Sequence, residues 1–250
     1  MKSEIARKLL MINPNTNTAT TERLQKTLHS LVPSGVDLDF MTAGFGSNYI
    51  ACESSHAVAA HACLQSWADY RLTQPGQLDG VLIGCFGDPG LFALREACGC
   101  PVTGLAEASF ILAAQRGAFA IVTGGERWRP MLQRLAQSLG YGHLLRHIET
   151  VVPSGAALQS DPEMAMRCLA EACAKAAVPG VQTVILGGAG LAGYAHGLRS
   201  HCPVPLIDSA EAGLQVLLQD LAPAAPYAGD GFFAQWRDMA PAIMNMPVRP

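Results

Sequence analysis

Basic residues are scarce in this chain, and no stretch concentrates them. Lysine and arginine together number 17 among 250 residues, against 20 aspartates and glutamates, so the formal net charge is only -3. Proteins that bind nucleic acid usually carry a basic face or stripe. Because the sequence shows neither, we expect no nucleic-acid partner.

Long apolar runs are also missing. A helix that crosses a membrane needs about 20 consecutive apolar residues, and every apolar run here is broken earlier by glycine or by a charged residue. The N-terminus meets Glu4 and Arg7 before its first apolar run, so it lacks the continuous apolar region of a secretion signal. These absences predict a cytoplasmic protein with no membrane partner.

Motifs that bind metals or phosphate are missing too. Cys98 and Cys100 form a C-x-C pair, but no second pair with the spacing of a zinc site follows it. Neither G-x-x-x-x-G-K-S/T nor G-x-G-x-x-G occurs in a context that binds phosphate. The eight cysteines lie in a long, helix-rich chain, which is typical of reduced thiols. The sequence therefore predicts no metal site and no phosphate loop.

Apolar residues, by contrast, make up 50% of the chain and fall into alternating short and long segments. Short apolar runs that end in glycine or polar residues predict buried strands, and the longer segments between them predict helices. This alternation predicts an α/β fold of parallel sheets with helices on both faces. Strands are expected at 8–12, 36–41, 79–84, 101–104, 118–123, 144–152, 181–186 and 204–207. Helices are expected at 19–31, 53–71, from 89 onward, 107–116, from 126 through 139, 161–177, 189–200, 210–221 and 230–239.

One thiol stands at the end of a strand that is predicted to be fully buried. In VLIGCFGDPG, residues 81–90, Cys85 follows the strand, and a helix is expected from Pro89 with Asp88 as its N-cap. Free N–H groups and the helix dipole lower the pKa of a thiol near a helix N-terminus. We therefore expect Cys85 to be a thiolate that acts as a nucleophile or base. The alternative is an inert buried thiol.

An internal repeat relates this stretch to a second one about 102 residues later. VLIGCFGDPGLFALREACGCPVTGLAEA is matched by VILGGAGLAGYAHGLRSHCPVPLIDSAEA, and Gly188 falls opposite Cys85. We expect one α/β half from residues 1–106 with 210–250 and a second half from 107–209, related by a pseudo-two-fold. The carboxyl ends of their strands should meet in a cleft that binds a small molecule.

Six motifs resemble those of the aspartate/glutamate/hydantoin racemase superfamily, and most of all its hydantoin and allantoin racemases. The resemblance implies two flavodoxin-like halves, no cofactor, and two facing cysteines that act as acid and base on opposite faces of a stereocentre. Cys85 matches the first of these cysteines, whereas Gly188 stands at the position of the second. The motifs are INPNTN at 12–17, GCFGDPGL at 84–91, PVTGLAEA at 101–108, IVTGG at 121–125, LGGAGLAG at 186–193 and PVPLIDS at 203–209.

The candidate substrate-binding residues follow the predicted strands at the cleft. Asparagine and threonine in these loops could simply form turns and caps, but the resemblance implies that they bind a carboxylate or imide. Backbone N–H groups beside Cys85 and Gly188 could stabilise an enolate, although the glycines could merely permit close packing. The candidates are Asn13, Asn15, Thr16, Phe86, Gly87, Thr123, Gly124, Gly125, Gly188 and Ala189. His56, His61 and His196 are poor substitutes for a second base. His56 and His61 are five residues apart in a predicted helix, off the same-face spacing of three or four, and His196 is expected about two helical turns past Gly188, away from the cleft.

The leading hypothesis is a cofactor-independent racemase that works at the acidic α-carbon of a small carbonyl compound, with Cys85 as acid and base. Because Gly188 offers no second base, a one-cysteine enzyme is the alternative: a decarboxylase of malonate-type acids or a covalent cis-trans isomerase. A third hypothesis is a non-catalytic protein that binds small molecules. The family resemblance and the apolar tail from Ala222 onward predict a homo-oligomer.

Overall fold

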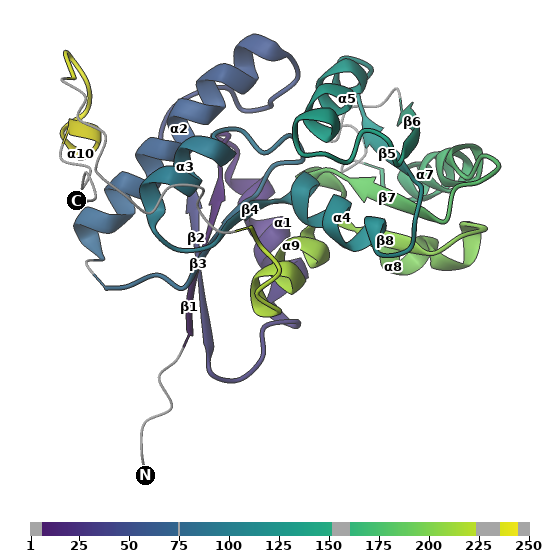
Figure 1. Ribbon diagram of the computed structural model, residues 1–250, viewed down its shortest axis with the longest axis horizontal. Coiled ribbons are helices and arrows are strands. Elements are labelled where there is room, and N and C mark those ends of the chain that lie inside the picture. The colour runs from purple at the N-terminus through teal and green to yellow at the C-terminus, as the bar shows by residue number, and fades with distance from the viewer. Residues whose placement is uncertain (1–6, 75, 152–160, 224–235, 245–250) are drawn as a thin grey trace.

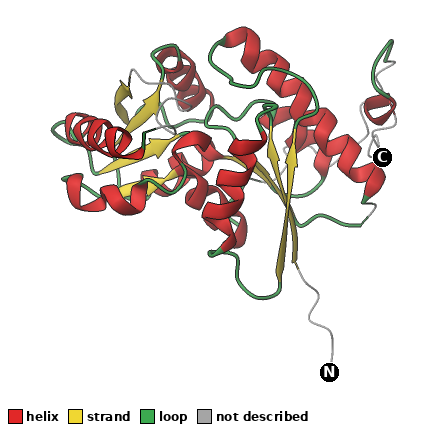
Figure 2. Cartoon of the chain, turned by 180° about the vertical axis from the view of Figure 1, so that it is seen from behind, coloured by secondary structure: helices red, strands yellow, loops and turns green. Residues whose placement is uncertain are grey.

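Two parallel four-stranded sheets form the framework of the molecule (Figures 1 and 2). The computed structural model describes residues 7–74, 76–151, 161–223 and 236–244. The strand order is β2-β1-β3-β4 in the first sheet and β6-β5-β7-β8 in the second, so the two sheets have the same topology. The prediction of an α/β fold built from two similar parallel-sheet halves is therefore confirmed.

All eight predicted strands are present, within a few residues of their expected bounds. The central strands β3, β5 and β7 are buried along their whole length, as expected for strands covered on both faces by helices. The strands are β1 (Arg7–Asn13), β2 (Val36–Thr42), β3 (Gly80–Ile83), β4 (Val102–Gly104), β5 (Phe119–Gly124), β6 (Leu145–Val151), β7 (Thr183–Gly187) and β8 (Leu206–Asp208).

Most of the predicted helices are present, and one is broken into pieces. The predicted helix 189–200 consists of three short segments, because Gly188 and Gly193 adopt φ values of +146° and +85° that interrupt helical geometry. The segments are η1 (Ala189–Leu191), α8 (Ala195–Leu198) and η2 (Arg199–His201). The other helices before the tail are α1 (Thr18–His29), α2 (Glu53–Thr73), α3 (Leu91–Cys98), α4 (Leu105–Ala114), α5 (Trp128–Ser138), α7 (Pro162–Ala176) and α9 (Ser209–Leu218).

Helices α4 and α9 lie in the middle of the molecule, pack against each other, and join the two halves (Figure 1). Each of them contacts the sheet that it does not follow in the chain. The ring of Phe110 in α4 stacks on Phe119 in β5, with 5.3 Å between ring centroids. The side chain of Leu217 in α9 packs on Gly80 in β3. The apolar core consequently runs from the first sheet through α4 and α9 to the second.

The tail adds one short helix to the body. Most of the helix expected at 230–239 lies outside the described residues, and residues 236–240 are not helical. Instead α10 (Pro241–Met244) packs on α2, and its Ala242 and Ile243 are buried. No helix among the described residues is long and apolar enough to cross a membrane.

Candidate active site

A cavity opens where strands of both sheets end. It encloses about 490 Å³, part of which is open to solvent. The loops after β1 and β3 form one wall, and β5 with the loop after β7 forms the other. It is lined by Asn15, Tyr49, Ile50, Gly84, Cys85, Phe86, Thr123, Gly124, Trp128, Gly187, Gly188, Ala189 and Leu191.

Seven of the eleven site residues proposed from the sequence line this cavity: Asn15, Cys85, Phe86, Thr123, Gly124, Gly188 and Ala189. The other four are within two residues of a lining residue in the sequence but do not line the cavity themselves. Asn13 is fully buried, and its amide donates to Asn15, to the carbonyl of Asn17 and to Thr21, so it holds the loop together. The N–H group of Thr16 donates to the carbonyl of Ser47. The last two, Gly87 and Gly125, contact the ring of Trp128.

Cys85 is almost fully buried, with 7% of its surface exposed, and it is a free thiol like the other seven cysteines. Burial raises the pKa of the Cys85 thiol well above its usual range, and the charges of Asp88 and Cys63 raise it further. The expectation that Cys85 is a thiolate is therefore wrong. Helix α3 begins only at Leu91, six residues after Cys85, so its dipole does not offset the burial. At neutral pH the resting residue is a protonated thiol that can donate its proton.

Gly188 contributes backbone alone to the opposite wall. A side chain at this position would have room, because the nearest atoms to an added Cβ are those of Leu191 at 3.5 Å. Its φ of +146° is nevertheless one that residues other than glycine rarely adopt. The N–H group of Gly188 donates to the hydroxyl of Ser209 at 3.2 Å, so it is already engaged. Of the described lining residues, Cys85 alone carries a thiol.

Asn15 is oriented by its neighbours. Its side-chain oxygen accepts from the amide of Asn13 at 3.1 Å and from the N–H group of Asn17 at 2.9 Å. With the oxygen occupied, the NH₂ group of Asn15 is the part of the side chain left to bind a ligand. The arrangement suits recognition of a carbonyl or carboxylate oxygen.

Two aromatic rings close the cavity from opposite halves. A Cβ on Gly187 would lie 2.2 Å from the ring of Phe86, and one on Gly87 would lie 2.4 Å from the ring of Trp128. Both glycines therefore allow a ring from the other half to lie directly on the backbone.

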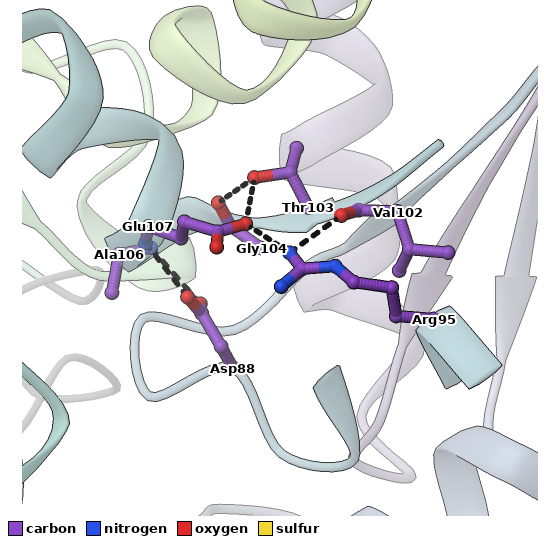
Figure 3. Close-up of polar contacts among 7 residues, drawn as sticks. All are labelled: Asp88, Arg95, Val102, Thr103, Gly104, Ala106 and Glu107. Carbon is purple, nitrogen blue, oxygen red and sulfur yellow. Dashed lines mark hydrogen bonds and ion pairs between the residues drawn. The ribbon is translucent and has the colours of Figure 1, made fainter. Parts of the chain in front are cut away.

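Asp88 does not cap the helix that follows it, so that sequence prediction is wrong. Gly90, with φ of +82°, is the N-cap residue of α3. The carboxylate of Asp88 instead accepts from the N–H groups of Ala106 and Glu107, at 2.9 and 2.7 Å, at the start of α4 (Figure 3). The loop that bears Cys85 is thereby tied to the helix that joins the two halves.

Glu107 and Glu211, which the repeat relates, both pair with an arginine. The side chain of Glu107 is buried and accepts from Arg95 at 2.5 Å and from Thr103 at 2.9 Å (Figure 3). Arg95 also donates to the carbonyl of Val102 at 2.9 Å. Glu211 lies 3.4 Å from Arg199, and the arginine of that pair is exposed. Neither glutamate lines the cavity, and their role is structural.

None of the three histidines considered from the sequence lines the cavity. Nε2 of His56 lies 2.8 Å from the carbonyl of Gly87, on the far side of the Trp128 ring. The ring of His61 packs edge-on against Phe45, with 5.0 Å between ring centroids, and His196 is exposed. Among the described residues, no three His, Cys, Asp or Glu side chains come together as a metal site would require.

Sequence reasoning missed six lining residues: Tyr49, Ile50, Gly84, Trp128, Gly187 and Leu191. A signal existed for two of them. Ile50 and Trp128 follow β2 and β5 at their carboxyl ends, the same position that identified Asn15. Trp128 went unnoticed because it lies four residues beyond its strand.

The comparison with known proteins agrees with this geometry. The family model described as Asp/Glu/Hydantoin racemase matches residues 9–217. The chain belongs to this family. The resemblance seen in the six motifs is therefore confirmed at the level of the family.

Several members of the family are similar over most of their length. Hydantoin racemase of Paenarthrobacter aurescens is 32% identical over 212 residues, which cover 84% of this chain and 89% of that protein. Hydantoin racemase of Pseudomonas sp. (strain NS671) is 30% identical over 221 residues, 83% of each chain. The structure of allantoin racemase from Klebsiella pneumoniae superposes with a TM-score of 0.80 at 27% identity, covering 92% of this chain and 97% of the other.

The fold extends to enzymes outside the racemases. Arylmalonate decarboxylase superposes with a TM-score of 0.58 at 17% identity, over 89% of this chain and 94% of the other. A maleate isomerase from Pseudomonas putida S16 superposes with the same TM-score at 13% identity, over 86% and 92%. At such identities the similarity concerns the fold alone.

Proposed function

We propose that this chain is a cofactor-independent enzyme that exchanges a proton at the acidic α-carbon of a small carbonyl compound of the hydantoin type. Cys85 is the proton donor and acceptor. The observation that carries the proposal is a single buried thiol in a cavity between the strand ends of two sheets, in a chain of the racemase family. The substrate class comes from the hydantoin and allantoin racemases to which the chain is similar.

The lining offers the groups that such a reaction needs. A carbanion beside a carbonyl is stabilised when hydrogen-bond donors surround the oxygen that gains charge. The NH₂ group of Asn15 is one such donor. The N–H group of Phe86, and that of Gly87 just outside the lining, have no acceptor among the described residues and are two more candidates. Phe86 and Trp128 exclude water, which strengthens these interactions.

A one-way reaction is the second candidate, and the state of Cys85 favours it. A thiol whose pKa is raised by burial is protonated at neutral pH, so a proton is in place for delivery, whereas the thiolate that a base requires is scarce. In a decarboxylation of a malonate-type acid, loss of carbon dioxide would leave an enolate, and Cys85 would protonate it from one face. Gly188 supplies no second acid or base, so the product would form with one handedness.

The remaining sequence predictions concern the setting of the reaction. We propose that the enzyme acts as a homo-oligomer in the cytoplasm on a small-molecule substrate, without a cofactor.

The experiment that tests the proposed function compares the wild type with Cys85→Ser. Purified protein is incubated with one enantiomer of a 5-substituted hydantoin in deuterated water and, separately, with a disubstituted malonate. Loss of the thiol should lower turnover by about 10²–10⁴-fold. Cys168→Ser removes a thiol outside the cavity and should leave turnover unchanged. If Cys85→Ser retains wild-type turnover, the proposal is wrong.

A further inference from the structure

Asp88 supplies the cap that helix α4 lacks in its own sequence. The N-cap position of α4 is Gly104, which has no side chain, although its extended backbone with φ of -119° and ψ of 176° is one that N-cap residues commonly adopt. Instead, the carboxylate of Asp88 accepts from the N–H groups of Ala106 and Glu107 at the start of α4 (Figure 3). A Cβ on Gly104 would lie 2.2 Å from the Asp88 carboxyl carbon, so the missing side chain is what lets Asp88 enter.

The second half contains the same connection, made in the opposite direction. Asp208 stands in α9 where Gly104 stands in α4, three residues before Glu211 and Glu107 respectively. The Asp208 carboxylate accepts from Ala210 at 2.9 Å, in its own helix, and from Gly193 at 2.8 Å, in the loop after Gly188. In each half, one carboxylate therefore ties a central helix to the loop that forms a cavity wall.

The hydrogen bonds of Asp88 to α4 act directly on the turn that bears the Cys85 thiol. The N–H group of Asp88 donates to the carbonyl of Cys85 at 3.2 Å, and Asp88 itself adopts φ of +48° with 4% of its surface exposed. A positive φ costs energy for a residue with a side chain and persists only where surrounding contacts hold it. The two hydrogen bonds to α4 are those contacts. Since Phe110 of α4 stacks on the second half, they also place the turn relative to the wall that contains Gly188.

We propose that Asp88 is a positioning residue, whose two hydrogen bonds to the start of α4 hold the Cys85 thiol at a fixed place in the cavity. Its effect on turnover rests on the proposed function, whereas its effect on the Cys85 turn does not. The proposal separates two roles of one carboxylate: capping α4, which stabilises the fold, and restraining the loop, which places the thiol.

Two variants separate these roles. Asp88→Gly removes the carboxylate, and glycine accepts the positive φ at this position. The double variant Asp88→Gly/Gly104→Asp returns a cap to α4 from the helix's own residue, in the way Asp208 caps α9, but leaves the loop untied. The three atoms nearest to the new Cβ all belong to the Asp88 side chain, so Asp88→Gly removes them.

Three measurements are made on each variant: the urea midpoint of unfolding, the rate of iodoacetamide labelling at Cys85 by peptide mass spectrometry, and kcat with KM. The fully buried Cys63 serves as an internal reference for labelling through global unfolding. Asp88→Gly should lower the midpoint and raise the ratio of Cys85 to Cys63 labelling by about five-fold or more, because the turn opens locally. The double variant should recover the midpoint, keep the fast labelling, and keep a kcat reduced by about 10-fold or more at unchanged KM.

Recovery of the midpoint together with wild-type labelling and kcat in the double variant would overturn the proposal, since capping would then be the whole role of Asp88. Asp161→Gly is the matched control: it removes the N-cap of α7, whose carboxylate accepts from Met164, and should leave Cys85 unchanged. If Asp88→Gly does not fold, Asp88→Asn takes its place, because it keeps one hydrogen-bond acceptor. Cys85 in this variant should still be labelled faster than in the wild type. Labelling of Cys85 at the wild-type rate would refute the positioning role of Asp88. If the wild type shows no turnover, the proposed function is wrong. The labelling rates still test whether Asp88 positions Cys85, because they do not depend on turnover.

Discussion

At the scale of single residues, Cys85 and Gly188 define what the cavity can do. A racemase that works by two bases needs a proton acceptor on one face of the carbon and a donor on the other. Here one wall carries a buried thiol and the other carries glycine backbone, whose N–H group is engaged with Ser209. The chemistry that fits is delivery and removal of a proton from the Cys85 side.

Gly188→Cys tests whether a second thiol is what limits two-faced racemisation. The cavity has room for the side chain, but the positive φ should lower the free energy of unfolding by about 1–3 kcal/mol. We expect racemisation, followed by optical rotation, to rise despite this loss, which urea unfolding would measure.

Gly188→Ala is the matched control, because it introduces the same backbone strain without a thiol. It should lose similar stability and gain no racemisation. Equal racemisation rates in the alanine and cysteine variants would show that the second thiol is irrelevant.

The sequence is sufficient to propose Cys85 as the reactive residue, but not to predict its protonation state. Cys85 is recognisable because it follows a buried strand at a glycine. Its pKa depends on burial under side chains distant in sequence and on the position of Asp88, and no local pattern contains either. For the same reason Trp128 escaped notice, since its ring reaches the cavity only through packing on Gly87.

At the scale of helices and loops, the buried Arg95–Glu107 pair joins α3 to α4. Its side chains are 7% and 2% exposed, so removing one partner leaves an uncompensated charge in the interior. Arg199 and Glu211 form the corresponding pair in the second half, each shifted by 104 residues. Both copies of the repeat therefore contain the pair, which is buried in the first half and more exposed in the second.

Arg95→Met should lower the free energy of unfolding by about 3–5 kcal/mol, because Glu107 loses its buried partner. Adding Glu107→Leu should restore part of that loss, since the unpaired charge is then gone. Urea denaturation measures both variants.

Arg199→Met is the comparison. It removes the exposed arginine that pairs with Glu211, and it should lower the free energy of unfolding by less than about 1 kcal/mol. Strictly additive losses in the double variant at 95 and 107 would contradict this account.

Helix positions were predictable from the sequence, whereas some capping partners were not. The longer segments between the predicted strands located α1, α2 and α7, and Asp161 caps α7 from its own sequence. Asp88 has the residue type of a local cap, yet it serves α4 eighteen residues away. A cap contributed from a distant loop cannot be predicted from the residues around the helix. It forms here because Gly104 has no side chain, which leaves space for the carboxylate of Asp88.

At the scale of the whole molecule, the internal repeat accounts for the two sheets of identical order and for the cavity between them. The alternation of strands and helices was sufficient to predict the fold class and both sheets, because parallel strands buried on two faces leave continuous apolar runs. The packing of α4 and α9 against the sheet that each does not follow in the chain depends on tertiary contacts rather than on the local sequence pattern.

Buried carboxylates in both halves make stability depend on pH. Burial raises the pKa of Asp88 to about 7 and that of Asp208 to about 6, from 3.8. Between pH 4 and 7 the unfolded chain has released protons that the folded chain still holds, so stability falls as pH rises through this window. Urea unfolding should show the free energy of unfolding decreasing across this window.

Asp88→Asn removes one of the two titrating groups and should reduce this slope. The difference between wild type and variant isolates Asp88 from the other acids. An identical slope in both proteins would show that Asp88 ionises in the folded state as it does in the unfolded chain.

The most direct test of one-faced proton chemistry at Cys85 compares two rates in one sample. A single enantiomer of a 5-substituted hydantoin is incubated with the enzyme in deuterated water, and exchange at the α-carbon is followed by NMR alongside optical rotation. The account predicts exchange about 10-fold or more faster than loss of rotation, and its disappearance in Cys85→Ser. The thiol takes a proton from the carbon, exchanges that proton for a deuteron from the solvent, and returns the deuteron to the same face. Equal rates of exchange and racemisation, no enzyme-dependent exchange, or exchange that survives Cys85→Ser would contradict it.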